Sequence, residues 1–160
     1  VSVSEDRLTV EFKSGKGIAR GLQALPSVGV TKWRLEVLEL CCSASHEDDQ
    51  AVVGICRDMY DIDRFQDGGS TPAVEAGSWL MTYSRKHGCT LWAEEEALPL
   101  EHPRDVAKNS IIDFIFNADA RTLRLMIDGI EISPFFESIP PGILYPMVAY
   151  VSVRSLQVDA

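Results

Sequence analysis

The chain has 160 residues, of which 46% are hydrophobic and 24% are charged, and its formal net charge is −9. This length suits one domain with a single core, and the composition is that of a globular protein rather than a disordered or fibrous one. Proteins that bind nucleic acid neutralise phosphates with Lys and Arg, so the acidic excess argues against a nucleic-acid partner. Charges interrupt every apolar stretch well before the ~20 residues that a membrane-spanning helix needs, so we also expect no membrane association.

The ends of the chain and its cysteines set further expectations. The first residues are polar and alternating, which predicts no secretory signal peptide. Strand-like patterns lie near both ends, so we expect residues 1–160 to form one domain cut from a larger protein. A chain of this size needs no disulfides, and Cys41 and Cys56 lie in apolar runs, so we interpret the 4 cysteines as free thiols. Free thiols predict an intracellular location, cytoplasmic or nuclear.

Short strand patterns dominate the chain, and helical periodicity is scarce. Apolar and polar residues alternate at 8–12 and 33–37, an apolar run follows at 51–56, and alternation returns at 145–153. Gly, Pro, Asp and Asn separate these segments. Such a series is typical of an all-β sandwich or barrel. In the second segment Trp33 is predicted to face the core, whereas Lys32, Arg34 and Glu36 face solvent; Trp79 is predicted to be a core residue as well.

The best-defined element is a three-stranded meander. Its polar turn and its Asp-Gly turn separate three segments with strand patterns, and both turns use residues that favour tight reversals. In order, these strands and turns are residues 111–116, 117–121, 122–127, 128–129 and 130–132.

Two long connections carry most of the remaining polar residues. Residues 58–77 contain several aspartates and glycines, and residues 94–109 contain three consecutive glutamates and two prolines. We expect both to be exposed loops with little regular structure, a kind of segment that is usually functional or mobile.

No motif for a cofactor or metal emerges. Residues 15–21 (GKGIARG) look like a phosphate-binding glycine loop, but the third glycine comes one residue late and no helical pattern follows. The histidines lie in separate segments, no C-x-x-C occurs, and the aspartates at 58–67 do not match the spacing of an EF-hand. We therefore expect no cofactor and no bound metal.

His87 and Cys89 are the strongest catalytic candidates. Strand residues two apart share a face, so this pair suggests a thiol nucleophile with its base. The sequence supplies no oxyanion loop, and its serines and aspartates are too numerous to indicate a triad. We therefore expect no catalytic residues and no enzymatic activity, and we keep a cysteine- or serine-dependent hydrolase as an alternative.

Several blocks, taken in order, form a recognisable series: IARGLQAL, GVTKWRLEV, VVGIC, GSWL, the hairpin at 111–129 and LYPMV. The series resembles the SPRY domain, the core of the B30.2 module, and it spans most of the chain. It departs from the family where Lys32-Trp33 replaces a Tyr-Trp pair and where residues 43–50 and 94–109 make longer polar connections. A Neuralized-type repeat is the nearest competing β-sandwich.

The resemblance implies a bent β-sandwich of two antiparallel sheets that is not catalytic. Members of the family recognise a protein or peptide partner through loops at one end. They often lie beside ubiquitin-ligase, kinase-scaffold, histone-methylation or calcium-channel modules, to which they deliver a target. The resemblance therefore predicts an adaptor, with substrate recruitment to a ubiquitin ligase as one form of that role. A domain that only packs against the rest of its own chain is a third hypothesis.

Carried onto this sequence, the resemblance implies four binding segments, at residues 14–18, 59–64, 83–87 and 151–152. Interfaces favour aromatic and Arg anchors, and these segments contain several. The residues expected to contact the partner are Lys16, Tyr60, Arg64, Tyr83, Arg85, Lys86, Val151 and Ser152.

Alternatives remain for some of these residues. Tyr83 is equally well explained as a buried residue whose hydroxyl binds backbone, and Arg64 as the partner of nearby aspartates. If Lys16, Arg20, Arg85 and Lys86 cluster, the partner is an acidic or phosphorylated segment. We expect the isolated domain to be monomeric.

Overall fold

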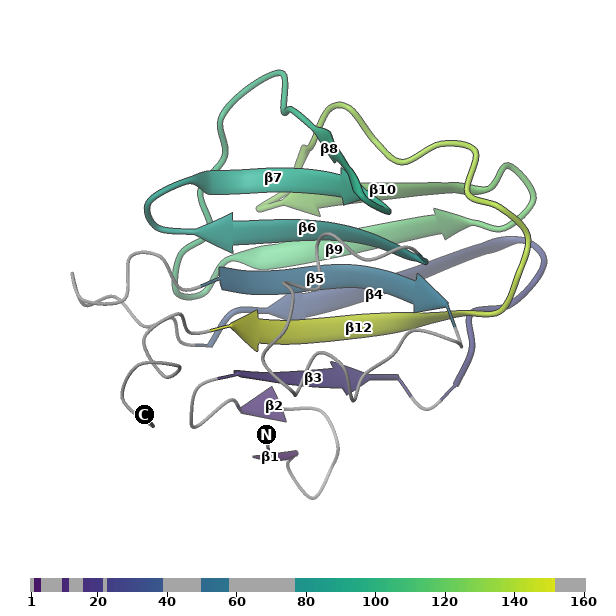
Figure 1. Cartoon of the computed structure of the whole chain (residues 1–160), viewed down its shortest axis with the longest axis horizontal. Coiled ribbons are helices and arrows are strands. Elements are labelled where there is room, and N and C mark those ends of the chain that lie inside the picture. Colours follow the sequence, from purple (N-terminus) through teal and green to yellow (C-terminus); the bar gives the residue numbers. More distant parts are fainter. Residues whose placement is uncertain are drawn as a thin grey trace.

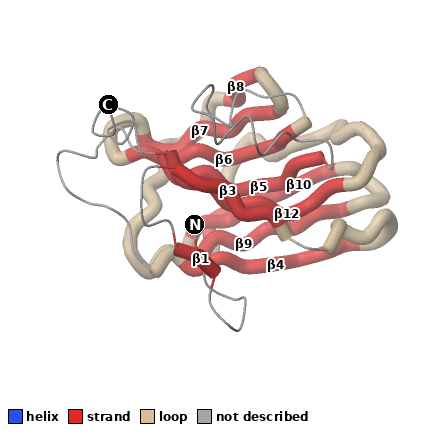
Figure 2. The backbone as a smooth tube through the Cα atoms, turned by 60° about the horizontal axis from the view of Figure 1, so that its bottom comes forward, coloured by secondary structure: helices blue, strands red, loops and turns tan. Residues whose placement is uncertain are grey.

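The structure is a computed structural model that describes residues 2–3, 10–11, 16–21, 23–38, 50–57 and 77–151. These residues form strands and no helix (Figure 2). The strands are β1 (Ser2–Val3), β2 (Val10–Glu11), β3 (Lys16–Arg20), β4 (Val30–Glu36), β5 (Gln50–Arg57), β6 (Ser78–Ser84), β7 (Gly88–Ala93), β8 (Glu96–Leu98), β9 (Ile111–Asn117), β10 (Thr122–Ile127), β11 (Ile130–Glu131) and β12 (Leu144–Val151). In this part of the chain no helix is long and apolar enough to cross a membrane.

Two antiparallel sheets lie face to face (Figure 1). One sheet has the strand order β3-β12-β5-β6-β7-β8, and the other has the order β11-β10-β9-β4; β1 and β2 form a separate pair. The predicted all-β sandwich of two antiparallel sheets is confirmed. The predicted meander is confirmed too, because β9, β10 and β11 are consecutive neighbours in the four-stranded sheet.

The main core fills the space between the two sheets. Alternate residues of β9 and β10 point inward, so that Phe114, Phe116 and Leu125 are at most 1% exposed. The facing sheet contributes Ile55 and Leu91, both fully buried. Period-two alternation thus places one face of each strand in the core.

The charged row of β4 faces solvent, as predicted. Trp33 is half-buried against the core, and its ring stacks on Phe114 of β9 with centroids 4.9 Å apart. On the other face, Arg34 Nε donates to Asp113 Oδ1 at 2.7 Å. That hydrogen bond, together with the nearby negative charge, raises the pKa of the exposed Arg34 guanidinium. The row is therefore the polar side of a strand that carries a core tryptophan.

The central strands of the six-stranded sheet are buried on both faces. Val52 and Leu80 lie in a second apolar cluster on the face away from the main core, and both are fully buried. Burial on both faces explains why residues 51–56 form a continuous apolar run instead of an alternating one. At Gly54 a Cβ would lie 2.2 Å from the Trp79 carbonyl oxygen, so only glycine fits between β5 and β6.

One expected loop contains a strand. Residues 94–109 were predicted to have little regular structure, and in the structure Glu94 and Glu95 form a tight turn, after which the short strand β8 pairs with β7. Sequence patterns do not indicate β8, because Glu96-Ala-Leu98 is short and has no β-branched residue, and it forms by pairing with β7. Residues 99–110 are irregular, as expected. The other expected loop, up to residue 76, lies outside the described residues.

Candidate functional site

One end of the six-stranded sheet collects segments that are far apart in the sequence. Lys16, the first residue of β3, lies directly opposite Val151, the last residue of β12. Val151 also lies opposite Gln50, where β5 begins. The turn from β6 to β7 leaves from the same end, on the left in Figure 1. We call this end of the sheet, where the strands begin or end at Lys16, Gln50 and Val151 beside the turn at residues 85–88, the Lys16–Val151 end.

The β6–β7 turn presents consecutive basic residues. Arg85, Lys86 and His87 are all exposed. The His87 N–H donates to Ser84 Oγ at 2.9 Å, and Gly88 closes the turn with φ 68°, a left-handed conformation that suits glycine. The turn is therefore a defined structure that holds Arg85 and Lys86 outward, at the end where β3 begins and β12 ends.

Tyr83 has a different environment from the turn that follows it. Its side chain is half-buried and packs against the main core, next to Cys89 on the neighbouring strand. This position agrees with the hypothesis of a structural tyrosine more than with that of an exposed anchor.

Arg20 lies apart from the turn. It ends β3, four residues and about 13 Å along the strand from Lys16. Its guanidinium stacks over the ring of Tyr145 with its carbon 4.3 Å from the centroid. The four cations that the sequence suggested therefore do not form one cluster: Arg20 belongs to the other end of the strand.

The remaining predicted binding residues lie outside the described part of the chain. These are Tyr60, Arg64 and Ser152. β5, the strand that precedes Tyr60 and Arg64, ends at Arg57, and Arg57 lies opposite Leu144 at the start of β12. The chain thus leaves β5 at the end of the sheet opposite to the β6–β7 turn.

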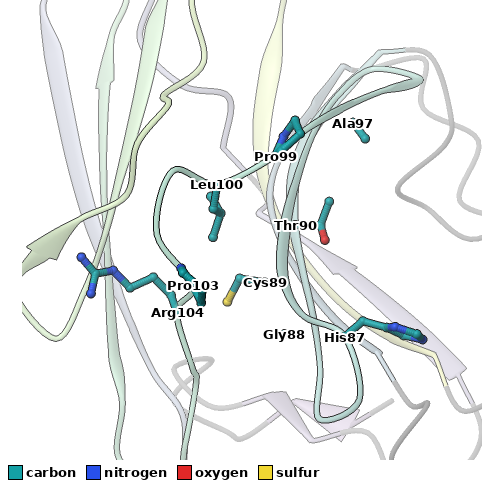
Figure 3. Close-up of a pocket in the computed structure, with 9 residues that line it drawn as sticks. All are labelled: His87, Gly88, Cys89, Thr90, Ala97, Pro99, Leu100, Pro103 and Arg104. Carbon is teal, nitrogen blue, oxygen red and sulfur yellow. The ribbon is translucent and has the colours of Figure 1, made fainter.

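His87 and Cys89 do not form a catalytic pair. Figure 3 shows their side chains on opposite sides of the chain, with the thiol toward Pro103 and the imidazole directed away from it. The expectation that they share a face was wrong because His87 belongs to the turn, and the left-handed Gly88 separates it from the regular strand. Burial, and secondarily the charge of Asp105, raises the pKa of Cys89 to about 12. Cys89 is therefore a protonated thiol at neutral pH and a poor nucleophile.

A groove runs beside the first half of β7. It has a volume of about 350 Å³, and residues from β7, β8 and the following segment line it (Figure 3). Its walls include Pro99, Leu100, Pro103 and Arg104, which lie in the second predicted loop, residues 94–109. No local pattern in the sequence indicates this groove, because it depends on where β8 stops pairing with β7.

The sandwich has the fold of SPRY domains. It is similar to the SPRY domain of human HERC1, with a TM-score of 0.64 and 21% identity, over 87% of this chain and 77% of the HERC1 chain. It is also similar to the TRIM65 PSpry domain, with a TM-score of 0.61 and 11% identity, over 88% of this chain and 70% of the TRIM65 chain. No protein-family model and no curated protein sequence matches the chain. The likeness is thus one of architecture.

Proposed function

We propose that this chain is a non-catalytic protein-interaction domain that captures a protein or peptide partner at the Lys16–Val151 end. The observation that carries the proposal is the SPRY-type fold, shared with the HERC1 and TRIM65 domains. The sequence resemblance associates this fold with partner recognition through loops at one end. The β6–β7 turn is a loop at one end of the six-stranded sheet.

The partner that suits this end carries negative charge. The chain as a whole has a net charge of −9, yet Arg85 and Lys86 are adjacent and exposed in one turn. Arg and Lys donate charge-assisted hydrogen bonds to carboxylates and phosphates, which are stronger than neutral ones. An acidic or phosphorylated segment is therefore the proposed ligand.

A binding role fits the chemistry of this end better than catalysis does. The Cys89 thiol is protonated at neutral pH because its pKa is raised to about 12, and His87 points away from it. We accordingly propose an adaptor without enzymatic activity, cofactor or metal. It acts as a monomeric, intracellular domain within a larger protein and recruits a substrate or assembles a scaffold.

The test is a double charge reversal, Arg85→Glu with Lys86→Glu. Loss of charge-assisted hydrogen bonds, at about 1.5–3 kcal/mol each, should reduce partner capture from a cell lysate at least about tenfold. Quantitative mass spectrometry of the captured proteins measures this loss. The melting temperature should stay nearly unchanged, because both side chains are exposed.

Lys32→Glu is the control for added negative charge at half the change in net charge, since Lys32 is an exposed cation in the middle of β4, on the other sheet. It should capture the same partners as the wild type. Equal capture by all three proteins would refute the proposed site, and equal loss in both variants would show a general charge effect instead.

A further inference from the structure

The six-stranded sheet has an unfinished edge beside Cys89. β7 begins at Gly88, but β8 pairs only with its second half, Leu91 to Ala93. Among the described residues, no strand pairs with residues 88–90 on the side away from β6. The sheet therefore loses one strand at this point, next to the β6–β7 turn.

The hydrogen-bond pattern shows which backbone groups this edge leaves exposed. The Glu94 N–H donates to the Ser78 carbonyl at 2.8 Å, so Glu94 and Ser78 form a hydrogen-bonded pair of the antiparallel ladder between β6 and β7. Hydrogen-bonded pairs then recur at every second residue of β7. Backbone groups alternate in direction along a strand, so Gly88 and Thr90 bond toward β6. The N–H and C=O of Cys89 consequently point to the open edge. No backbone hydrogen bond within the described residues satisfies them from that side.

β8 stops because the chain crosses to another part of the molecule. Continued pairing would place Leu100 opposite Cys89, two residues beyond the Leu91–Leu98 pair. Instead the Glu101 N–H donates to the Ser133 carbonyl at 2.9 Å, just after β11. This bond draws the segment away from β7 and leaves the position opposite Cys89 vacant.

The vacated position is the groove described above. Its volume of about 350 Å³ lies at the lower end of the range for ligand sites, so it suits a few residues and not a helix. Cys89, Leu100 and Pro103 give it an apolar interior (Figure 3). The two prolines in its wall have no N–H, so they supply no donor to the Cys89 carbonyl.

We propose that an extended segment of the partner adds here as a short β-strand and exchanges backbone hydrogen bonds with Cys89. This inference rests on the proposed function and specifies how the partner is held. The residue opposite Cys89 places a small apolar side chain toward Leu100 and Pro103, because directly opposite residues share a face. Its neighbours face the other side of the sheet, the side on which Figure 3 shows the His87 ring. Main-chain bonds supply affinity and the alternate side chains supply specificity.

The probe is a linear peptide obtained by selecting a phage-displayed library of random heptapeptides on the 160-residue chain. The selected peptide is synthesised in a normal form and in a form N-methylated at its central residue. Methylation removes one backbone donor and should weaken binding about tenfold. In NMR spectra of the labelled protein, the normal peptide should shift the Cys89 amide and slow its hydrogen exchange.

Two variants of the protein complete the test. Cys89→Pro removes both the outward N–H and the thiol, whereas Cys89→Ala removes the thiol alone, so Cys89→Pro should bind more weakly than Cys89→Ala. Proline restricts the preceding Gly88, so a melting curve accompanies this variant, and the N-methylated peptide tests the same bond if the variant unfolds.

The outcomes separate this inference from the proposed function. Selected peptides could bind without shifting the NMR signal of the Cys89 amide and lose their affinity for the double variant Arg85→Glu with Lys86→Glu. In that case the strand addition is wrong, and the Lys16–Val151 end remains the binding site. Failure to select any peptide while the wild type still captures partners from lysate also overturns the strand addition. Failure of both selection and capture overturns both proposals, and binding of small molecules alone in the groove overturns the peptide as its occupant.

Discussion

Cys89 is the residue whose chemistry depends most on its surroundings. Its side chain packs against the core and its pKa is raised to about 12, from an ordinary value of 9.0, by burial first and by Asp105 second. The same burial that makes the thiol a poor nucleophile also couples its protonation to folding. The thiol keeps its proton in the folded state at pH values where the unfolded chain loses it.

We predict that Cys89 makes the domain less stable in alkali. Below about pH 9 both states hold the proton, and the thiol's contribution is fully present. Between about pH 9 and 12 only the unfolded state releases it, so the free energy of unfolding falls as pH rises, by at most about 1.4 kcal/mol per unit. Urea titrations from pH 7 to 10.5, under reducing conditions, should show a steeper fall for the wild type than for Cys89→Ala. Parallel curves would contradict the burial-raised pKa.

At the scale of elements, β4 and β9 are joined by an aromatic contact. Trp33 and Phe114 lie directly opposite each other and their rings are stacked. Trp33→Ala removes that contact and leaves a cavity. We expect the free energy of unfolding to fall by about 3 kcal/mol, the lower end of the range for such changes, because Trp33 is half-buried.

Denaturant unfolding measures this loss, and Lys32→Ala is its control. Lys32 is the neighbouring residue on the exposed face of β4, so its replacement should change stability by less than about 0.5 kcal/mol. Similar losses in both variants would mean that the inward row of β4 has been assigned to the wrong face.

Elements with a local signal could be predicted from the sequence, and elements that depend on a neighbour could not. The β9–β10 hairpin has alternation and turn residues, so its position was predicted nearly to the residue. β8 has neither, and forms because β7 offers it an edge. The opposite orientations of His87 and Cys89 depend on the left-handed Gly88, which a spacing argument does not include.

At the scale of the whole molecule, the candidate site depends on sheet order. Lys16, Arg85 and Val151 come from three distant segments, and only the order β3-β12-β5-β6 brings their strand ends to one side. Family resemblance pointed to these segments, whereas composition and periodicity do not. Neither family resemblance nor sequence pattern indicates the groove beside Cys89, because it arises where the shorter strand β8 stops pairing with β7.

The shared core makes a prediction about the molecule as a whole. Ile55 and Leu91 from one sheet pack in the same cluster as Phe114 and Leu125 from the other, so neither sheet can lose its partner without exposing its own apolar face. We therefore expect one cooperative unfolding transition. Calorimetry should give a van't Hoff enthalpy equal to the calorimetric enthalpy, at a midpoint that coincides with the loss of tryptophan fluorescence.

Tryptophans in both sheets make the fluorescence probe informative. Trp33 lies in the four-stranded sheet, and Trp79 and Trp92 lie in the six-stranded sheet. Trp33→Phe therefore leaves tryptophans in the six-stranded sheet alone, and the double variant Trp79→Phe with Trp92→Phe leaves one in the four-stranded sheet alone. Coincident midpoints are expected for every variant when each is compared with its own calorimetric transition. Two separated transitions, one seen by Trp33 and the other by Trp79, would contradict a single domain and would mean that the sheets are stabilised independently.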